Sequence, residues 1–120
     1  MTYRAPVTAH AVLRYLKRIE GFDLRPLVER LGRNAGNWTL ARAACAEMGV
    51  DITEVQRRIC PEHLAEAVHA GAGRIRRPGM ILFCQNGLVT TVTSEIHVHR
   101  MRQRSKREIR QYLQRSIRRR

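Results

Sequence analysis

The chain has 120 residues, the size of one ordinary domain, which leaves no room for a second independent core of similar size. Its 43% hydrophobic and 28% charged residues are typical of a globular protein and argue against wholesale disorder. Lys and Arg number 23 against ten Asp and Glu, and the formal net charge of +13 favours a polyanionic partner, nucleic acid above all.

Membrane, export and metal signals are missing from the sequence. No apolar run approaches the roughly 18 residues needed to span a bilayer, and residues 1–9 lack the apolar centre of a signal peptide. The cysteines Cys45, Cys60 and Cys84 are widely spaced and form no CxxC pair, so neither a disulfide framework nor a zinc knuckle is indicated. We therefore expect a cytoplasmic protein with reduced thiols and without a metal or cofactor.

The first predicted helix covers residues 8–20. Thr8 is a favourable N-capping residue, and Gly21 is a typical helix stop. At about 100° per residue, one face of this helix is apolar and the opposite face is cationic. The apolar face consists of Val12, Leu16 and Ile19. The cationic face consists of His10, Arg14 and Lys17.

Four further helical patterns follow in the N-terminal half. They are Asp23–Leu31, Trp38–Met48, Asp51–Ile59 and Pro61–His69. The first of them is expected to bury a stripe of Leu24, Leu27, Val28 and Leu31. Residues 11–31 also resemble residues 39–59, since each segment has a helix-ending glycine followed by an aspartate at matching positions. Either an internal duplication or the common punctuation of helices explains this likeness.

The second half of the chain changes to β-rich patterns. Residues 80–85 and 88–93 are joined by Asn86-Gly87, the dipeptide that most favours a tight hairpin. Residues 74–76 are expected to pair as a third strand, and residues 96–99 alternate like part of a fourth. The predicted class is α+β: a helical N-terminal half packed on a small antiparallel sheet, followed by a basic C-terminal helix.

The chain is expected to divide into one domain over residues 1–99 and a basic tail over residues 100–120. The tail has ten of the 23 basic residues and a single acid. A capping box at Ser105 to Glu108 and apolar residues at i, i+4 and i+8 after it predict a helix. Together with earlier arginines, the tail supplies the expected nucleic-acid contacts: Arg18, Arg74, Arg76, Arg77, Arg102, Arg104, Lys106, Arg107, Arg110, Arg115, Arg118 and Arg119.

The candidate chemistry depends on cations, imidazoles and hydroxyls, because glycine-rich phosphate loops, zinc-protease motifs and acidic metal clusters are missing from the sequence. That set suits cleavage of RNA, in which a base deprotonates a ribose 2′-OH and cations neutralise the phosphate. His10 is the acid/base candidate because imidazole titrates near neutrality, and Arg14 and Lys17 would hold the phosphate. The alternative interpretation of this helical face is a solvated cationic surface.

Residues 7–18, together with the hairpin that ends in Val89-Thr90-Thr91-Val92, resemble small bacterial and phage toxins of the BrnT/RelE kind. These proteins belong to a group of metal-independent ribonucleases that also includes barnase, EndoU and colicin types. The matching parts are residues 7–23 and 74–94. A helical insertion at about residues 24–60 and the basic tail depart from the pattern of that group.

The resemblance implies that His10 is the acid/base and that Arg14, with Lys17 or Arg18, contacts the phosphate. It also implies that Thr91 or Thr93 supplies a hydroxyl from the last strand. The expected function is that of a toxin-type endoribonuclease that leaves 2′,3′-cyclic phosphate ends, with a protein antitoxin as a possible partner.

Two other functions are also compatible with these sequence features. One is a non-catalytic protein, phage-encoded for example, that uses its basic tail to bind nucleic acid or a host nucleoprotein. The other is an interaction protein whose basic helix docks on an acidic partner or on phospholipid. The chain has only six aromatic residues, which argues against an extended surface for base stacking. Contacts with the charged nucleic-acid backbone are therefore expected to supply most of the affinity.

Overall fold

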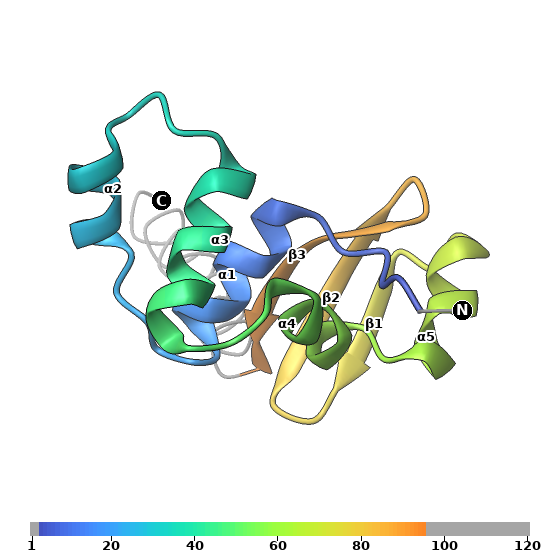
Figure 1. Cartoon of the computed structure of the whole chain (residues 1–120). Coiled ribbons are helices and arrows are strands. Elements are labelled where there is room, and N and C mark those ends of the chain that lie inside the picture. The colour runs from blue at the N-terminus through green and yellow to red at the C-terminus, as the bar shows by residue number, and fades with distance from the viewer. Residues whose placement is uncertain (1–2, 96–120) are drawn as a thin grey trace, which may run out of the picture.

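The computed structural model describes residues 3–95, which form five helices and one antiparallel sheet of three strands (Figure 1). The predicted α+β class is confirmed. The predicted fourth strand at residues 96–99 and the predicted tail helix lie outside the described residues. The helices are α1 (Ala9–Arg18), α2 (Arg25–Leu31), α3 (Asn37–Met48), α4 (Ile52–Ile59) and α5 (Glu62–His69). The strands are β1 (Arg74–Arg77), β2 (Met80–Gln85) and β3 (Leu88–Ser94).

The helix ends follow the capping residues of the sequence. The Thr8 side chain accepts a hydrogen bond from the backbone N–H of Ala11 and caps α1, as predicted. Asp51 caps α4 in the same way, through the backbone N–H of Thr53. Asp23 accepts from the backbone N–H two residues further on, as Asp51 does. Internal duplication and shared helix punctuation both explain this likeness.

The hairpin forms at the predicted turn. Asn86 and Gly87 have φ values of 55° and 76°, the left-handed conformations that a tight two-residue hairpin turn requires. β2 lies in the centre, with β1 and β3 antiparallel on its two sides. Leu82 pairs with Val92, and both side chains are fully buried on one face of the sheet. Ile81 and Thr93 pair in the same register, and alternation along the strand directs them to the other face.

Helix α1 lies at the centre of the fold. It packs against β3 on one side and against α3 and α4 on the other (Figure 1). Val12 and Leu16 of α1 are fully buried in one cluster with Leu82, Val92 and other core residues. Burial of this stripe leaves the cationic face of α1 at the surface.

The segment before α1 is hydrogen-bonded along the outer edge of β3. Val7 forms a parallel bridge with Val89, whose backbone N–H donates to the Pro6 carbonyl at 2.7 Å. The Thr8 backbone N–H donates back to the Val89 carbonyl at 3.1 Å. These bonds fix the start of α1 beside the sheet.

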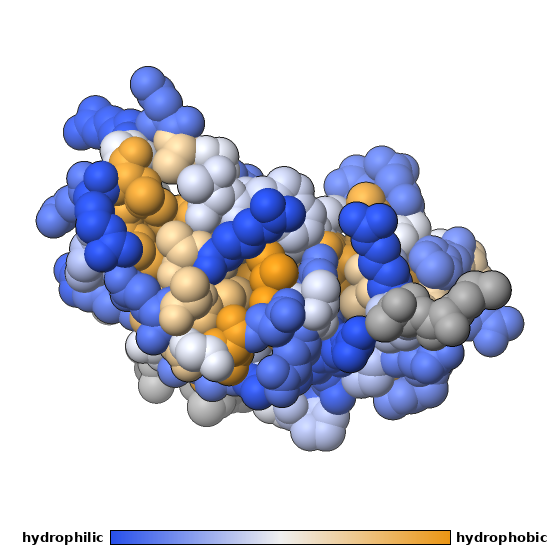
Figure 2. All heavy atoms as spheres, in the orientation of Figure 1, coloured by the Kyte–Doolittle hydropathy of each residue, from blue (hydrophilic) through white to orange (hydrophobic). Residues whose placement is uncertain are grey.

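Helix α2 differs from its prediction. Of the expected buried stripe, only Leu27 is buried, whereas Val28 and Leu31 are each 38% exposed. The physical reason is that this seven-residue helix packs chiefly against α3, so the core covers only one side of it. Figure 2 shows apolar side chains exposed between α2 and α3, with hydrophilic ones around them.

Within residues 3–95, no helix is long and apolar enough to cross a membrane.

Candidate nucleic-acid interface

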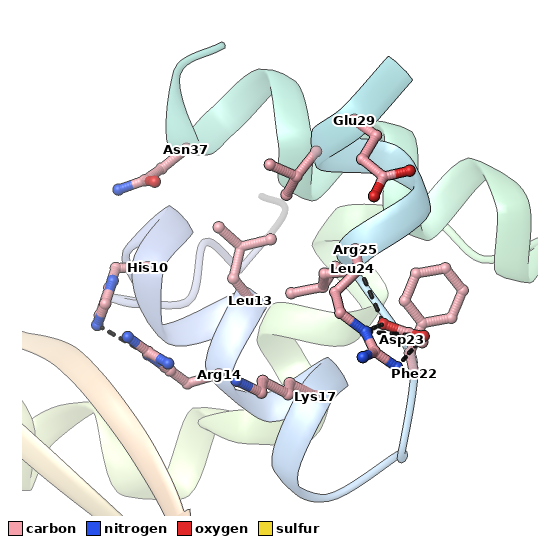
Figure 3. A pocket seen from close by; sticks show the side chains of 11 residues that line it. His10, Leu13, Arg14, Lys17, Phe22, Asp23, Leu24, Arg25, Glu29 and Asn37 are labelled. Carbon is pink, nitrogen blue, oxygen red and sulfur yellow. Dashed lines mark hydrogen bonds and ion pairs between the residues drawn. The ribbon is translucent and has the colours of Figure 1, made fainter. Parts of the chain in front are cut away.

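A cavity of about 740 Å³ lies between α1, α2 and the start of α3 (Figure 3). The cationic face of α1 forms one wall, and the three residues predicted to act together, His10, Arg14 and Lys17, all line it. Leu13, Phe22, Leu24 and Val28 supply apolar surface, and Asp23, Arg25, Glu29 and Asn37 complete the lining. We call this space the His10 cavity.

His10 is held in contact with Arg14, one helical turn along α1. The Arg14 Nε donates to His10 Nε2 at 3.3 Å (Figure 3). Burial lowers the pKa of His10 below its ordinary value of 6.5, and the charges of Arg14 and Arg18 lower it further. The imidazole is therefore neutral at pH 7, which is the state that a general base requires.

The charges in the rest of the cavity are partly compensated. Arg25 pairs with Asp23 at 3.0 Å, and hydrogen bonds from Arg25 hold the pKa of the Asp23 carboxyl below its usual value. By contrast, Arg14 and Lys17 make no ion pair within residues 3–95. Neither cation is paired at salt-bridge distance, although the charge of Lys17 also acts on the Asp23 carboxyl, and Glu29 on the α2 wall opposes a bound anion.

The predicted strand hydroxyls are not in this cavity. Thr91 pairs with Phe83 and Thr93 with Ile81, on the sheet face opposite the one that packs on α1. The Thr93 hydroxyl is buried and has no hydrogen-bond partner in the described part of the chain. Neither threonine lines the His10 cavity.

Two of the arginines expected to bind nucleic acid are used by the fold. Arg18 donates from Nη1 to the Val92 carbonyl of β3 at 3.0 Å. Arg77 donates to the carbonyls of Arg58 and Ile59 and so satisfies the last turn of α4. In both residues Nη1 is occupied by a backbone carbonyl, so the fold fixes the position of each guanidinium and leaves fewer donors for a phosphate.

The other predicted cations are divided between the sheet and the tail. Arg74 and Arg76 are exposed on β1, and Arg76 lies 3.5 Å from a Glu95 carboxylate oxygen. The tail cations lie outside the described residues: Arg102, Arg104, Lys106, Arg107, Arg110, Arg115, Arg118 and Arg119.

A second concave surface, of about 830 Å³, was not predicted from the sequence. We call it the Trp38 groove. Residues 3–7, the first turns of α3 and the start of α4 form its walls, together with His69 and Leu88. Its parts come from distant segments of the chain, so no local pattern marks the whole. The spacing of Trp38 and Arg42, one helical turn apart, was the available signal.

The three cysteines carry no reactive site. Cys45 and Cys60 are buried and Cys84 is partly buried, and burial raises the pKa of each thiol. Thiols with raised pKa values stay protonated and are poor nucleophiles. Among residues 3–95, no three potential metal ligands of the His, Cys, Asp and Glu types cluster together.

No protein-family model, curated protein or solved structure matches the chain. The resemblance to ribonuclease toxins therefore stays a prediction from residues 7–23 and 74–94.

Proposed function

We propose that the protein binds RNA and cleaves it in the His10 cavity, as a metal-independent endoribonuclease of the toxin type. The observation that supports this best is an imidazole with a lowered pKa in one cavity with two cations that form no ion pair within residues 3–95. A base and a phosphate site in one place are the minimum that the reaction requires.

Each residue has a defined part in the proposed reaction. His10 takes the proton of the ribose 2′-OH, the 2′ oxygen attacks phosphorus, and the bond from phosphorus to the 5′ oxygen breaks. Arg14 and Lys17 neutralise the charge that develops on the phosphoryl oxygens. The imidazolium then returns its proton to the 5′ oxygen, so the products are a 2′,3′-cyclic phosphate and a 5′-hydroxyl.

The hydrogen bond between Arg14 and His10 would couple substrate binding to activation of the base. In the free protein, the Arg14 Nε–H occupies the lone pair of His10 Nε2. A phosphate bound to the Arg14 guanidinium competes for the same N–H. Substrate binding would therefore release Nε2 to accept the proton of the 2′-OH.

The test is cleavage of a labelled single-stranded RNA in EDTA by wild type and by His10→Ala. We expect the variant to cleave at least about 100-fold more slowly, which is the scale of a lost acid/base group. His63→Ala is the matched control, because His63 is exposed on α5 and lines neither cavity. It should cleave at the wild-type rate.

Circular dichroism of each variant checks that the fold is retained. Equal rates for wild type and His10→Ala would show that the cavity is not the catalytic site, and a wild-type preparation that cleaves no RNA would refute the proposed activity altogether.

One observation favours binding without cleavage as a second candidate function. Thr91 and Thr93 lie outside the cavity, so the strand hydroxyl that was expected to act beside His10 is not among the described residues that line it. A protein of this type would retain wild-type RNA affinity in EDTA while leaving the RNA intact.

A further inference from the structure

We propose that the Trp38 groove binds an unpaired nucleotide of single-stranded RNA, with the base stacked on Trp38 and the adjoining phosphates on Arg4 and Arg42. This inference rests on the proposed RNA binding but not on cleavage, and it assigns a second contact surface outside the His10 cavity.

Trp38 is far more exposed to solvent than the core residues are. Its side chain is 46% exposed, although it stands in the first turn of a helix that packs into the core. Arg42 lies one turn further along α3 and lines the same groove. An aromatic ring and a guanidinium at this spacing lie on one face of the helix, with stacking area beside positive charge.

The charge of the groove suits a phosphodiester. Among residues 3–95, its lining includes Arg4, Arg42 and His69, but no Asp or Glu. Neither arginine has an ion pair within the part of the chain that the structure describes. The His10 cavity, in comparison, contains two carboxylates. The groove is therefore the better site for the backbone of a polyanion.

One wall of the groove is fixed before any ligand arrives. The Gln56 side-chain amide donates to the Val7 carbonyl at 2.9 Å, and the Tyr3 hydroxyl donates to the Cys60 carbonyl at 2.9 Å. Pro6 and Val89 are joined by the backbone bond along the edge of β3. A wall held in this way loses little conformational freedom on binding, which favours affinity.

The groove and the cavity lie on the two sides of the same helical turn. Asn37 lines the His10 cavity, and Trp38, the next residue, lines the groove. The stacking site therefore begins one residue along α3 from the lining of the His10 cavity.

Trp38 is the single tryptophan of the chain, so its fluorescence reports on this groove alone. The experiment titrates the full chain with a 12-nucleotide oligouridine, with an RNA duplex of the same length and with inorganic polyphosphate. We expect the single strand to quench the emission strongly. The duplex and the polyphosphate should quench it much less, because they offer charge without an accessible base.

Binding of fluorescein-labelled oligouridine, followed by anisotropy, tests the variants. Trp38→Ala should weaken binding about tenfold, within the range for loss of one stacked base, and Trp38→Phe should restore most of it. Leu31→Ala is the matched control, since it removes an exposed apolar side chain that lines neither cavity. It should bind as wild type does.

The outcomes separate the two proposals. Selective quenching by oligouridine supports the groove even if the wild type cleaves no RNA, the result that refutes the ribonuclease. Cleavage that depends on His10, with no quenching and with wild-type affinity in Trp38→Ala, refutes the groove and leaves the ribonuclease intact. Equal quenching by polyphosphate and oligouridine also refutes the proposal, because the groove would then bind charge alone.

Discussion

The two concave surfaces beside the first turn of α3 differ in the group at their centre and in their charge. The His10 cavity contains a titratable imidazole, cations and two carboxylates. Among the described residues, the Trp38 groove contains an indole, two arginines and an imidazole, that of His69, but no carboxylate. An imidazole beside cations suits proton transfer, and an indole offers a π-face that stacks on any base. Two concave surfaces of similar size that begin at neighbouring residues of α3 are therefore suited to different chemistry, because different side chains line them.

The surroundings of the two spaces differ as well. One wall of the His10 cavity is α2, a short helix with a single buried side chain, Leu27. One wall of the groove is the segment of residues 3–7, which backbone hydrogen bonds join to β3. We expect the cavity to adjust its width to a ligand more readily than the groove does.

The largest expected effect is a loss of folding stability that impairs both surfaces together. Leu16→Ala truncates a fully buried side chain of α1. This helix lines the His10 cavity and packs against α3, which contributes a residue to each surface. Deletions of this kind cost about 2–5 kcal/mol. Urea denaturation followed by circular dichroism should show that loss, and cleavage and tryptophan quenching should decline together. A stability change below about 1 kcal/mol would contradict the central place of α1 in the core.

A smaller effect should sharpen the charge difference. Glu29→Gln removes a carboxylate from the wall of the His10 cavity, so RNA affinity at low salt should rise about two- to threefold, as expected for one repulsion at several ångströms in water. Anisotropy measures this change. Glu66→Gln, an exposed site on α5 outside both surfaces, should leave affinity unchanged. Equal gains in the two variants would mean that net charge, and not the cavity, sets the affinity.

The smallest effect concerns the pH dependence of cleavage, which tests the His10 cavity. Because the pKa of His10 lies below 6.5, the neutral base persists at lower pH than for a free imidazole. The midpoint of the acidic fall in rate should therefore lie below pH 6.5. Arg14→Gln removes a charge that lowers this pKa, so the acidic midpoint should move upward.

NMR titration of the His10 ring gives the same pKa without reference to activity. Quenching at Trp38 should not follow this midpoint. A shift of the midpoint to lower pH in Arg14→Gln would contradict the assigned influence of Arg14.

The local features of the fold were predictable because each depends on neighbours in sequence. Thr8 and Asp51 cap their helices through bonds that span two or three residues, and Asn86-Gly87 forms its turn from its own conformational preferences. The grouping of His10, Arg14 and Lys17 followed from helix periodicity alone.

The features that were not predicted depend on contacts between distant segments. The bridge of Val7 to Val89 joins the two ends of the domain, and without it the wall of the Trp38 groove cannot be placed. The exposed side of α2 follows from what its neighbours leave uncovered. Likewise, only the structure shows that Arg18 and Arg77 have backbone carbonyls as partners, because a sequence does not reveal which cations the fold requires.

The segment of residues 6–8 and the side chain of Arg18 together cover the outer edge of β3. The carbonyl of Val89 accepts from Thr8, and that of Val92 accepts from Arg18. An edge strand with free backbone groups is a template on which another chain can add a strand and begin to aggregate. Here the backbone groups of Val89 and the carbonyl of Val92 have partners within the domain, and the opposite edge strand, β1, presents arginines that repel a second positively charged copy. The same cations that suit an RNA ligand therefore also help to keep the sheet from growing between molecules.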